Sequence, residues 1–159
     1  MKVLILGKAG HGKDTVAELL HKIYGLKFSS SSMFVLEKVI YPALKDKYGY
    51  TSEQECYEDR VNHRKEWHDL IHEYNSPDLT KLTRELLEQN DIYVGLRNMS
   101  EYLYTRHLYD LILWVDADQR VPADDESLSI RYDSTSMERL DNNESVHELV
   151  EQILELDIK

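Results

Sequence analysis

The sequence has little of what secreted, membrane-embedded or disordered proteins depend on. Among its 159 residues there is one cysteine, Cys56, which excludes an internal disulfide and a metal site built from several cysteines. Its apolar runs are only a few residues long, far short of a membrane span, and the first residues lack the build of a signal peptide. We therefore expect a protein of a reducing, cytoplasmic compartment that has no membrane partner.

Positive charge is also scarce. Lysine and arginine total 19 against 30 aspartate and glutamate residues, which gives a formal net charge of -11. Such a chain does not attract nucleic acid through its overall field, so a sequence-nonspecific DNA-coating protein is disfavoured, although a local basic cleft stays open. Hydrophobic residues make up 42%, and this length suits a single domain over 1–159.

Apolar runs alternate with helical patterns along the chain. Runs at 3–6, 27–29, 92–94 and 111–115 predict strands, and helical spacing over 14–24, 33–46, 61–74, 78–87 and 146–153 predicts helices. The four serines at 29–32 are expected to form a loop after the second strand. This order predicts an α/β fold with a mostly parallel sheet covered by helices. Two longer stretches lie between these elements, a helical one over 33–89 and a polar one over 118–137.

The first loop matches the phosphate-binding pattern G-x-x-x-x-G-K. It lies between a buried strand and a helix N-terminus, where glycines let successive N–H groups point into one concavity and the helix dipole favours an anion. Lys13 would add a positive charge for the β- and γ-phosphates of ATP. The candidate nucleotide-binding residues are Gly7, Lys8, Ala9, Gly10, His11, Gly12, Lys13, Asp14 and Thr15.

The position after Lys13 departs from the usual pattern. Asp14 stands where a serine or threonine commonly gives its hydroxyl to Mg²⁺, and Thr15 follows. Asp14 and Thr15 are the candidate Mg²⁺ ligands, because hard cations favour oxygen donors. A carboxylate in the first turn of a helix is equally well explained by the helix dipole alone.

Three blocks of the sequence resemble the deoxynucleoside monophosphate kinases of tailed phages. They are the Gly-Lys-Asp-Thr of the loop, the strand 91–94 followed by Arg97 and Glu101, and the block 141–145 before the last helix. The resemblance implies a P-loop kinase fold and places Asn142 and Asn143 near the adenine of the donor nucleotide. It covers the two ends of the chain, and the middle matches less securely.

Two departures point to a subgroup. Gly95 stands where the larger phage kinases have an acidic residue two positions before the arginine, and the chain is short. Both features are more similar to the compact phage kinases that phosphorylate 5-hydroxymethyluracil within DNA, on the way to hypermodified thymidines. The segment 59–67 is similar to that group as well. For a phage-encoded chain, the compartment is the host cytoplasm.

Phosphoryl transfer needs cations on the moving group and a carboxylate near the acceptor hydroxyl. Arg97 and Asp116 each follow a strand, at the edge where ligands bind in open α/β sheets, and with Lys13 they are the candidate catalytic residues. Glu101 is expected to orient Arg97, although the two also fit an ordinary i, i+4 pair, and Asp116 also fits a turn cap. Candidate acceptor-binding residues are Ser31, Ser32, Arg60, Arg64 and Glu101. The helical stretch 33–89 is expected on the acceptor side of the site. The polar stretch 118–137 is a candidate lid, with Arg120 and Arg131 as the lid residues.

Arg60 and Arg64 illustrate the competing explanations. Their spacing predicts one helix face that clamps an acceptor phosphate, but paired surface charges are commoner. The acceptor is either 5-hydroxymethyluracil in DNA, which we favour, or a free deoxynucleoside monophosphate, which the acidic charge favours. A nucleotide-dependent switch is a further alternative, but the guanine-reading N-K-x-D element is absent. The sequence leaves the oligomeric state open.

Overall fold

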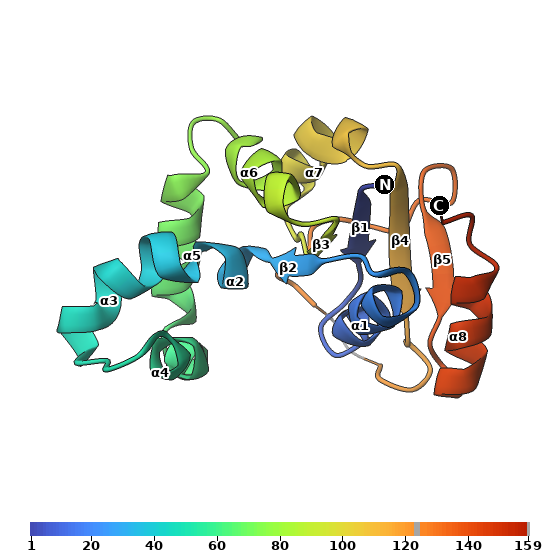
Figure 1. Cartoon of the computed structure of the whole chain (residues 1–159), viewed down its shortest axis with the longest axis horizontal. Helices are drawn as coiled ribbons and strands as arrows, with labels where there is room; N and C mark the ends of the chain where they lie inside the picture. The colour runs from blue at the N-terminus through green and yellow to red at the C-terminus, as the bar shows by residue number, and fades with distance from the viewer. Residues whose placement is uncertain (123–124, 159) are drawn as a thin grey trace.

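The computed structural model describes residues 1–122 and 125–158. The described residues form one five-stranded, fully parallel sheet in the order β2-β3-β1-β4-β5 (Figure 1). The strands are β1 (Val3–Leu6), β2 (Phe28–Ser30), β3 (Ile92–Val94), β4 (Leu111–Asp116) and β5 (Glu138–Asp141). The predicted α/β fold is confirmed. Because all strands run the same way, their carboxyl ends meet at one edge of the sheet, where ligands bind in such folds.

Two layers of helices cover the two faces of the sheet. On one face, α1 (Lys13–Tyr24) and α8 (Val146–Leu154) bury Val16, Leu20 and Leu149 against alternate residues of the central strands. On the other face, α6 (Lys81–Gln89) and α7 (Met99–Thr105) pack in a second cluster, which includes Tyr93 and Trp114. A short 3₁₀ turn, η3 (Arg106–Leu108), leads from α7 to β4. The three central strands, β1, β3 and β4, are apolar on both faces, as burial from two sides requires.

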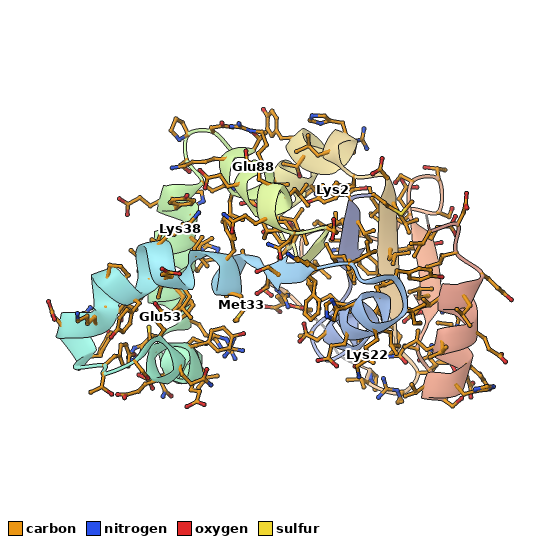
Figure 2. All side chains as sticks on the ribbon, in the orientation of Figure 1. Lys2, Lys22, Met33, Lys38, Glu53 and Glu88 are labelled. Atoms are coloured by element: carbon orange, nitrogen blue, oxygen red, sulfur yellow. The ribbon has the colours of Figure 1, made fainter. Side chains whose placement is uncertain are left out.

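A helical arm extends from the β2 edge of the sheet (Figure 1). It consists of α2 (Ser31–Val35), the π-helical turn η1 (Leu36–Ile40), α3 (Tyr41–Tyr48), α4 (Glu53–Glu58), the 3₁₀ turn η2 (Asp59–Asn62) and α5 (Arg64–Tyr74). Figure 2 shows Lys38 and Glu53 on this arm, whereas Lys2 and Lys22 lie on the sheet-bearing part. The helix predicted over 33–46 is divided into α2, η1 and α3, and Pro42 stands in the first turn of α3. Proline is tolerated there because the first turn of a helix leaves its N–H groups unpaired.

The structure differs from the sequence-based expectations at two places. The four serines do not form a loop: Ser29 and Ser30 belong to β2, and Ser31 opens α2, because the Ser30 side chain accepts a hydrogen bond from the Met33 N–H and caps the helix. Strand β5 was not predicted. It is a short edge strand in which only Leu140 is buried, so it carries no apolar run.

No helix in the ranges 1–122 and 125–158 combines the length and the apolar character that crossing a bilayer requires.

Candidate functional site

The loop between β1 and α1 has the backbone of a phosphate cradle. Gly7, Gly10 and Gly12 all have positive φ angles, of 152°, 77° and 100°. A Cβ at Gly7 would lie 2.6 Å from the carbonyl oxygen of Val115, and one at Gly12 would collide with the side-chain amide of Asn142. Glycine is therefore required at both ends of the loop by close neighbours as well as by conformation.

Lys13 is folded back over this loop. Its Nζ donates hydrogen bonds to the carbonyl oxygens of Gly7 at 2.8 Å and Lys8 at 3.0 Å. Burial and the nearby positive charge of Arg97 lower the pKa of Lys13 to about 8. Two cations from separate elements thus converge on the predicted phosphate site, and an anion placed between them would relieve their repulsion.

His11 ties the loop to the segment that follows β4. Its side chain is 1% exposed. The Ala117 N–H donates to Nδ1 at 3.1 Å, so Nε2 carries the hydrogen and donates to the Val121 carbonyl oxygen at 2.9 Å. Beside it, Lys8 forms an ion pair with Asp118 at 2.9 Å. His11 is therefore a structural brace of the loop, with both ring nitrogens committed to the backbone.

The asparagines after β5 brace the loop from the other side. Asn142 is 7% exposed, and its Nδ2 donates to the His11 carbonyl oxygen at 2.9 Å. Asn143 Oδ1 accepts from the backbone N–H groups of Gln119 at 2.8 Å and Arg120 at 3.3 Å. The Arg120 Nε in turn donates to the Asn142 carbonyl oxygen at 3.1 Å. Of the two asparagines predicted near the donor nucleotide, Asn142 contacts the phosphate loop, and Asn143 and Arg120 join the segments after β4 and β5.

Arg97 lies at the exit of β3 and bonds to the segment after β4. Its Nη1 donates to Asp125 Oδ2 at 2.6 Å and to the Ser127 hydroxyl at 2.8 Å. The expected contact with Glu101 is wrong, because Arg97 precedes Asn98, the N-cap of α7, and so shares no helical turn with Glu101. Glu101 instead accepts from Asn75 Nδ2 at 2.8 Å, and burial raises its pKa.

Asp125 is a site residue that the sequence did not indicate. Its Oδ2 also accepts from the Ala9 N–H of the phosphate loop at 2.9 Å, and its side chain is 9% exposed. Burial opposes its ionisation, but hydrogen bonds from Ser127, Arg97 and Ala9 hold the pKa of Asp125 well below its usual range. The residue falls in a polar stretch without periodicity, so no signal in the sequence separated it from a surface loop.

Asp116 ends β4 at the predicted edge of the sheet. Its carboxylate accepts from Arg139 Nη2 at 2.5 Å and from the Asp118 N–H at 2.8 Å. Burial favours the neutral form of the Asp116 carboxyl group. The hydrogen bonds from Asp118 and Arg139 outweigh this effect and keep the pKa of Asp116 below its usual value. His11, Asp116 and Asp118 bring potential metal-ligand atoms within 4.8 Å of one another. Because both His11 nitrogens are committed and Asp116 holds Arg139, this trio is better explained as a structural network.

Asp14 and Thr15 fit the Mg²⁺ expectation in position and in chemistry. Both lie in the first turn of α1 and both are exposed. The Asp14 carboxylate is close enough to Lys13 to raise the pKa of that lysine, opposing the effect of burial. An oxygen donor set beside the phosphate loop suits a hard cation.

The predicted acceptor-side residues separate into two groups. Ser31 and Glu101 meet around Tyr93: burial raises the pKa of the Tyr93 phenol, the Glu101 charge adds to this, and a hydrogen bond with Ser31 opposes it. Ser32 follows Ser31 in the first turn of α2 and is partly buried.

Arg60 and Arg64 do not form the expected clamp. Arg60 lies in η2 and Arg64 opens α5, and the backbone of His63 between them, at φ −136°, leaves the helical region. The Arg60 guanidinium lies 3.9 Å from the centroid of the Tyr57 ring and donates to the Tyr57 carbonyl oxygen at 3.0 Å. The i, i+4 rule failed here because it assumes one unbroken helix.

The segment after β4 has no helix or strand among its described residues until β5. Part of it, 125–132, borders a cavity of about 700 Å³ that also touches Lys8, Trp114 and Arg139. Arg131 lines this cavity, so the two candidate lid arginines face different places. Ala123 and Asp124, which fall in the predicted lid, lie outside the described residues.

Comparison with known proteins supports the fold. Neither a scan against protein-family models nor a search of curated proteins finds a match. Among solved structures, the chain is similar to a shikimate kinase from Aquifex aeolicus, with a TM-score of 0.53 and 14% identity over 97% of this chain and 94% of that one. It is also similar to a gluconokinase from Sinorhizobium meliloti, with a TM-score of 0.51 and 14% identity over 96% of this chain and 89% of that one. The phosphate loop, the parallel sheet and these similarities together give the chain the fold of the P-loop kinases.

Proposed function

We propose that this protein transfers the γ-phosphoryl group of ATP to a hydroxyl group of a deoxynucleotide. The observation that carries the proposal is that two cations from separate elements meet at a glycine-rich loop. Lys13 Nζ donates to the carbonyl oxygens of Gly7 and Lys8 in this loop. Arg97 bonds to Asp125, whose carboxylate accepts from the Ala9 N–H of the same loop. A site that only held the β-phosphate would need the loop and its lysine alone. A second cation from the end of the neighbouring strand suits the charge that develops on a phosphoryl group in transfer.

The chain supplies distinct roles for the reaction. The backbone N–H groups of the loop and Lys13 would hold the phosphates, while Asn142 and His11 keep the loop in shape. Arg97 would neutralise the transferred group, and Asp116 is the proposed base or a carboxylate acting through water. Arg120, bonded to Asn142, lies on the proposed donor-nucleotide side.

Asp14 and Thr15 are the residues that would hold Mg²⁺, with Asp116 as a further carboxylate at the same edge of the sheet. When bound, the ion neutralises phosphate charge and orients the β- and γ-oxygens. The carboxylate of Asp14 places its negative charge next to Lys13 in the first turn of α1, so it would position the ion beside the phosphates.

For the acceptor, we favour 5-hydroxymethyluracil in DNA. The support comes from the sequence: the short chain and Gly95 are similar to the compact phage kinases that act on this base. Ser31, Ser32 and Glu101 are the residues proposed to line the acceptor, whereas Tyr93, which is 2% exposed, belongs to the core. The net charge of -11 favours the second candidate, a free deoxynucleoside monophosphate, because it brings one phosphate instead of a polyanion.

One experiment separates the candidates. The protein is incubated with ATP labelled at the γ-phosphate in separate reactions, one for each acceptor. The acceptors are duplex DNA containing 5-hydroxymethyluracil, duplex DNA lacking it, and each of a panel of free deoxynucleoside monophosphates. Label in the modified duplex alone supports the favoured acceptor, and label in monophosphates alone replaces it with the second candidate. Release of phosphate with no labelled acceptor supports a switch or NTPase.

Lys13→Ala is the matched control. The Lys13 ammonium bonds only to carbonyl oxygens of its own loop among the contacts described, so its removal costs little packing. Full transfer by a folded Lys13→Ala protein contradicts the kinase proposal.

A further inference from the structure

The phosphate loop already holds an anion that belongs to the chain. The Asp125 carboxylate accepts hydrogen bonds from the Ala9 N–H at 2.9 Å and from Arg97 Nη1 at 2.6 Å, and its negative charge acts on Lys13. A main-chain amide of a glycine-rich loop, a guanidinium and an ammonium are the donors that bind phosphate oxygens in such sites. Asp125 thus uses the donors that the proposed nucleotide needs.

We infer that Asp125 is a built-in phosphate surrogate, which competes with the nucleotide for the Ala9 N–H and Arg97 and must be displaced when ATP binds. This inference rests on the nucleotide binding proposed above. The Ala9 N–H is a single donor, so a phosphate oxygen that takes it must replace the Asp125 carboxylate there. The two anions would also repel each other beside the shared Arg97 guanidinium. ATP affinity therefore includes the cost of breaking the contacts of Asp125.

The neighbours of Asp125 show how such a displacement stays local. The Ser127 hydroxyl donates to Asp125 Oδ1 at 2.6 Å, which holds the carboxylate toward Arg97. Two residues further on, the Ser129 N–H donates to the Arg97 carbonyl oxygen at 2.9 Å, and its hydroxyl accepts from the Met99 N–H at 2.8 Å. Leu128 and Ile130 are 7% and 1% exposed and lie in the core. The segment is anchored beyond Ser127, so the carboxylate can leave without the core opening.

The same displacement affects the proposed transfer step. As long as Asp125 accepts from Arg97 Nη1, that donor is used by a carboxylate, which also offsets the positive charge that the phosphoryl group needs. Asp125 also borders the cavity of about 700 Å³ beside Lys8 and Trp114. Arrival of the nucleotide phosphate would thus release Arg97 for the reaction and change the charge at the mouth of that cavity.

The test is the affinity for MgATP of Asp125→Asn, measured by isothermal titration calorimetry. The variant keeps the size of the side chain and removes its charge, so we expect MgATP to bind about tenfold more tightly than to the wild type, as for one charge-assisted contact relieved. Asp133→Asn is the control. It removes the same charge from the same segment. The hydrogen bonds of the Asp133 carboxylate to described residues stay within its own turn, to Thr135 and Ser136, so we expect unchanged affinity.

A second variant guards against misfolding of the first. Ser127→Ala keeps the charge of Asp125 and removes one bond that holds it, so we expect an increase in affinity of about two- to threefold. The inference is overturned if the wild type binds MgATP and both Asp125→Asn and Ser127→Ala bind it equally well or more weakly. The proposed function would still stand in that case. No binding of MgATP by the wild type or by either folded variant refutes both.

Discussion

The lowered pKa of Lys13 predicts a specific pH dependence of nucleotide binding. Burial and the charge of Arg97 bring this pKa to about 8. With that value, Lys13 is about 90% charged at pH 7 and about 10% charged at pH 9. Only the charged form attracts phosphate, and bound phosphate returns the pKa toward its ordinary value. In the free protein, Lys13 loses its proton as the pH rises through 8. Phosphate binding above that pH must return this proton to Lys13, so the free energy of binding becomes less favourable as the pH rises.

The expected magnitude follows from the charged fraction. Between pH 7 and pH 9 the charged fraction of Lys13 falls about tenfold, so the Kd for MgATP should rise about tenfold, with most of the change above pH 8. Binding at pH 9 should also take up close to one proton, against about a tenth of a proton at pH 7. Calorimetry in two buffers of different ionisation enthalpy measures both quantities in one series.

Lys13→Arg is the control for this prediction. A guanidinium stays charged throughout this range, so the variant should bind with a Kd that is flat between pH 7 and pH 9, whatever its absolute affinity. An equally steep rise in Lys13→Arg, or a flat profile in the wild type, would refute the assignment of the titration to Lys13. Circular dichroism at each pH confirms that the fold is retained.

Three further predictions concern the frame of the site. Arg97→Ala should lower kcat by at least about tenfold while the KM for ATP changes by less than about threefold, because Arg97 acts mainly on the transferred group. Steady-state kinetics with an active acceptor measures both constants, and an unchanged kcat contradicts the prediction. Asn142→Ala should lower the free energy of unfolding by about 1–3 kcal/mol, because the buried His11 carbonyl oxygen loses its hydrogen-bond partner. Urea denaturation measures this loss, and substitution of the exposed neighbour, Glu144→Ala, is the control. Gly12→Ala should abolish MgATP binding, because φ at this position is 100° and the added Cβ would collide with the Asn142 side chain. Wild-type affinity of this variant in calorimetry contradicts the described loop geometry.

The features that the sequence determined by itself are local ones. A continuous apolar run, three glycines and a helical pattern within 25 residues identify β1, the phosphate loop and α1, because each depends on neighbours in the chain. The same holds for Gly25, which ends α1 in the left-handed conformation, and for Ser52, whose side chain caps α4. Periodicity and turn chemistry act over a few residues and are visible in the sequence.

Spacing rules failed where they needed an unbroken element. Arg60 and Arg64, and likewise Arg97 and Glu101, have helical spacing, but a 3₁₀ turn and an N-cap fall between them. Strand β5 has no apolar pattern in the sequence, because this edge strand buries only Leu140 and keeps charged residues on its exposed side.

The tertiary structure sets which distant groups meet at the phosphate loop. Asn142 reaches His11 across 131 positions of the sequence, and Asp125 reaches Ala9 across 116. Parallel strands bring these segments to one edge of the sheet, but the partner that each polar side chain finds there depends on the path of irregular segments such as 125–132. That path is set by the burial of Leu128 and Ile130 and by the bonds of Ser129 to Arg97 and Met99, none of which has a periodic signature. The phosphate loop was therefore readable from the residues alone, whereas the carboxylate that occupies it was not.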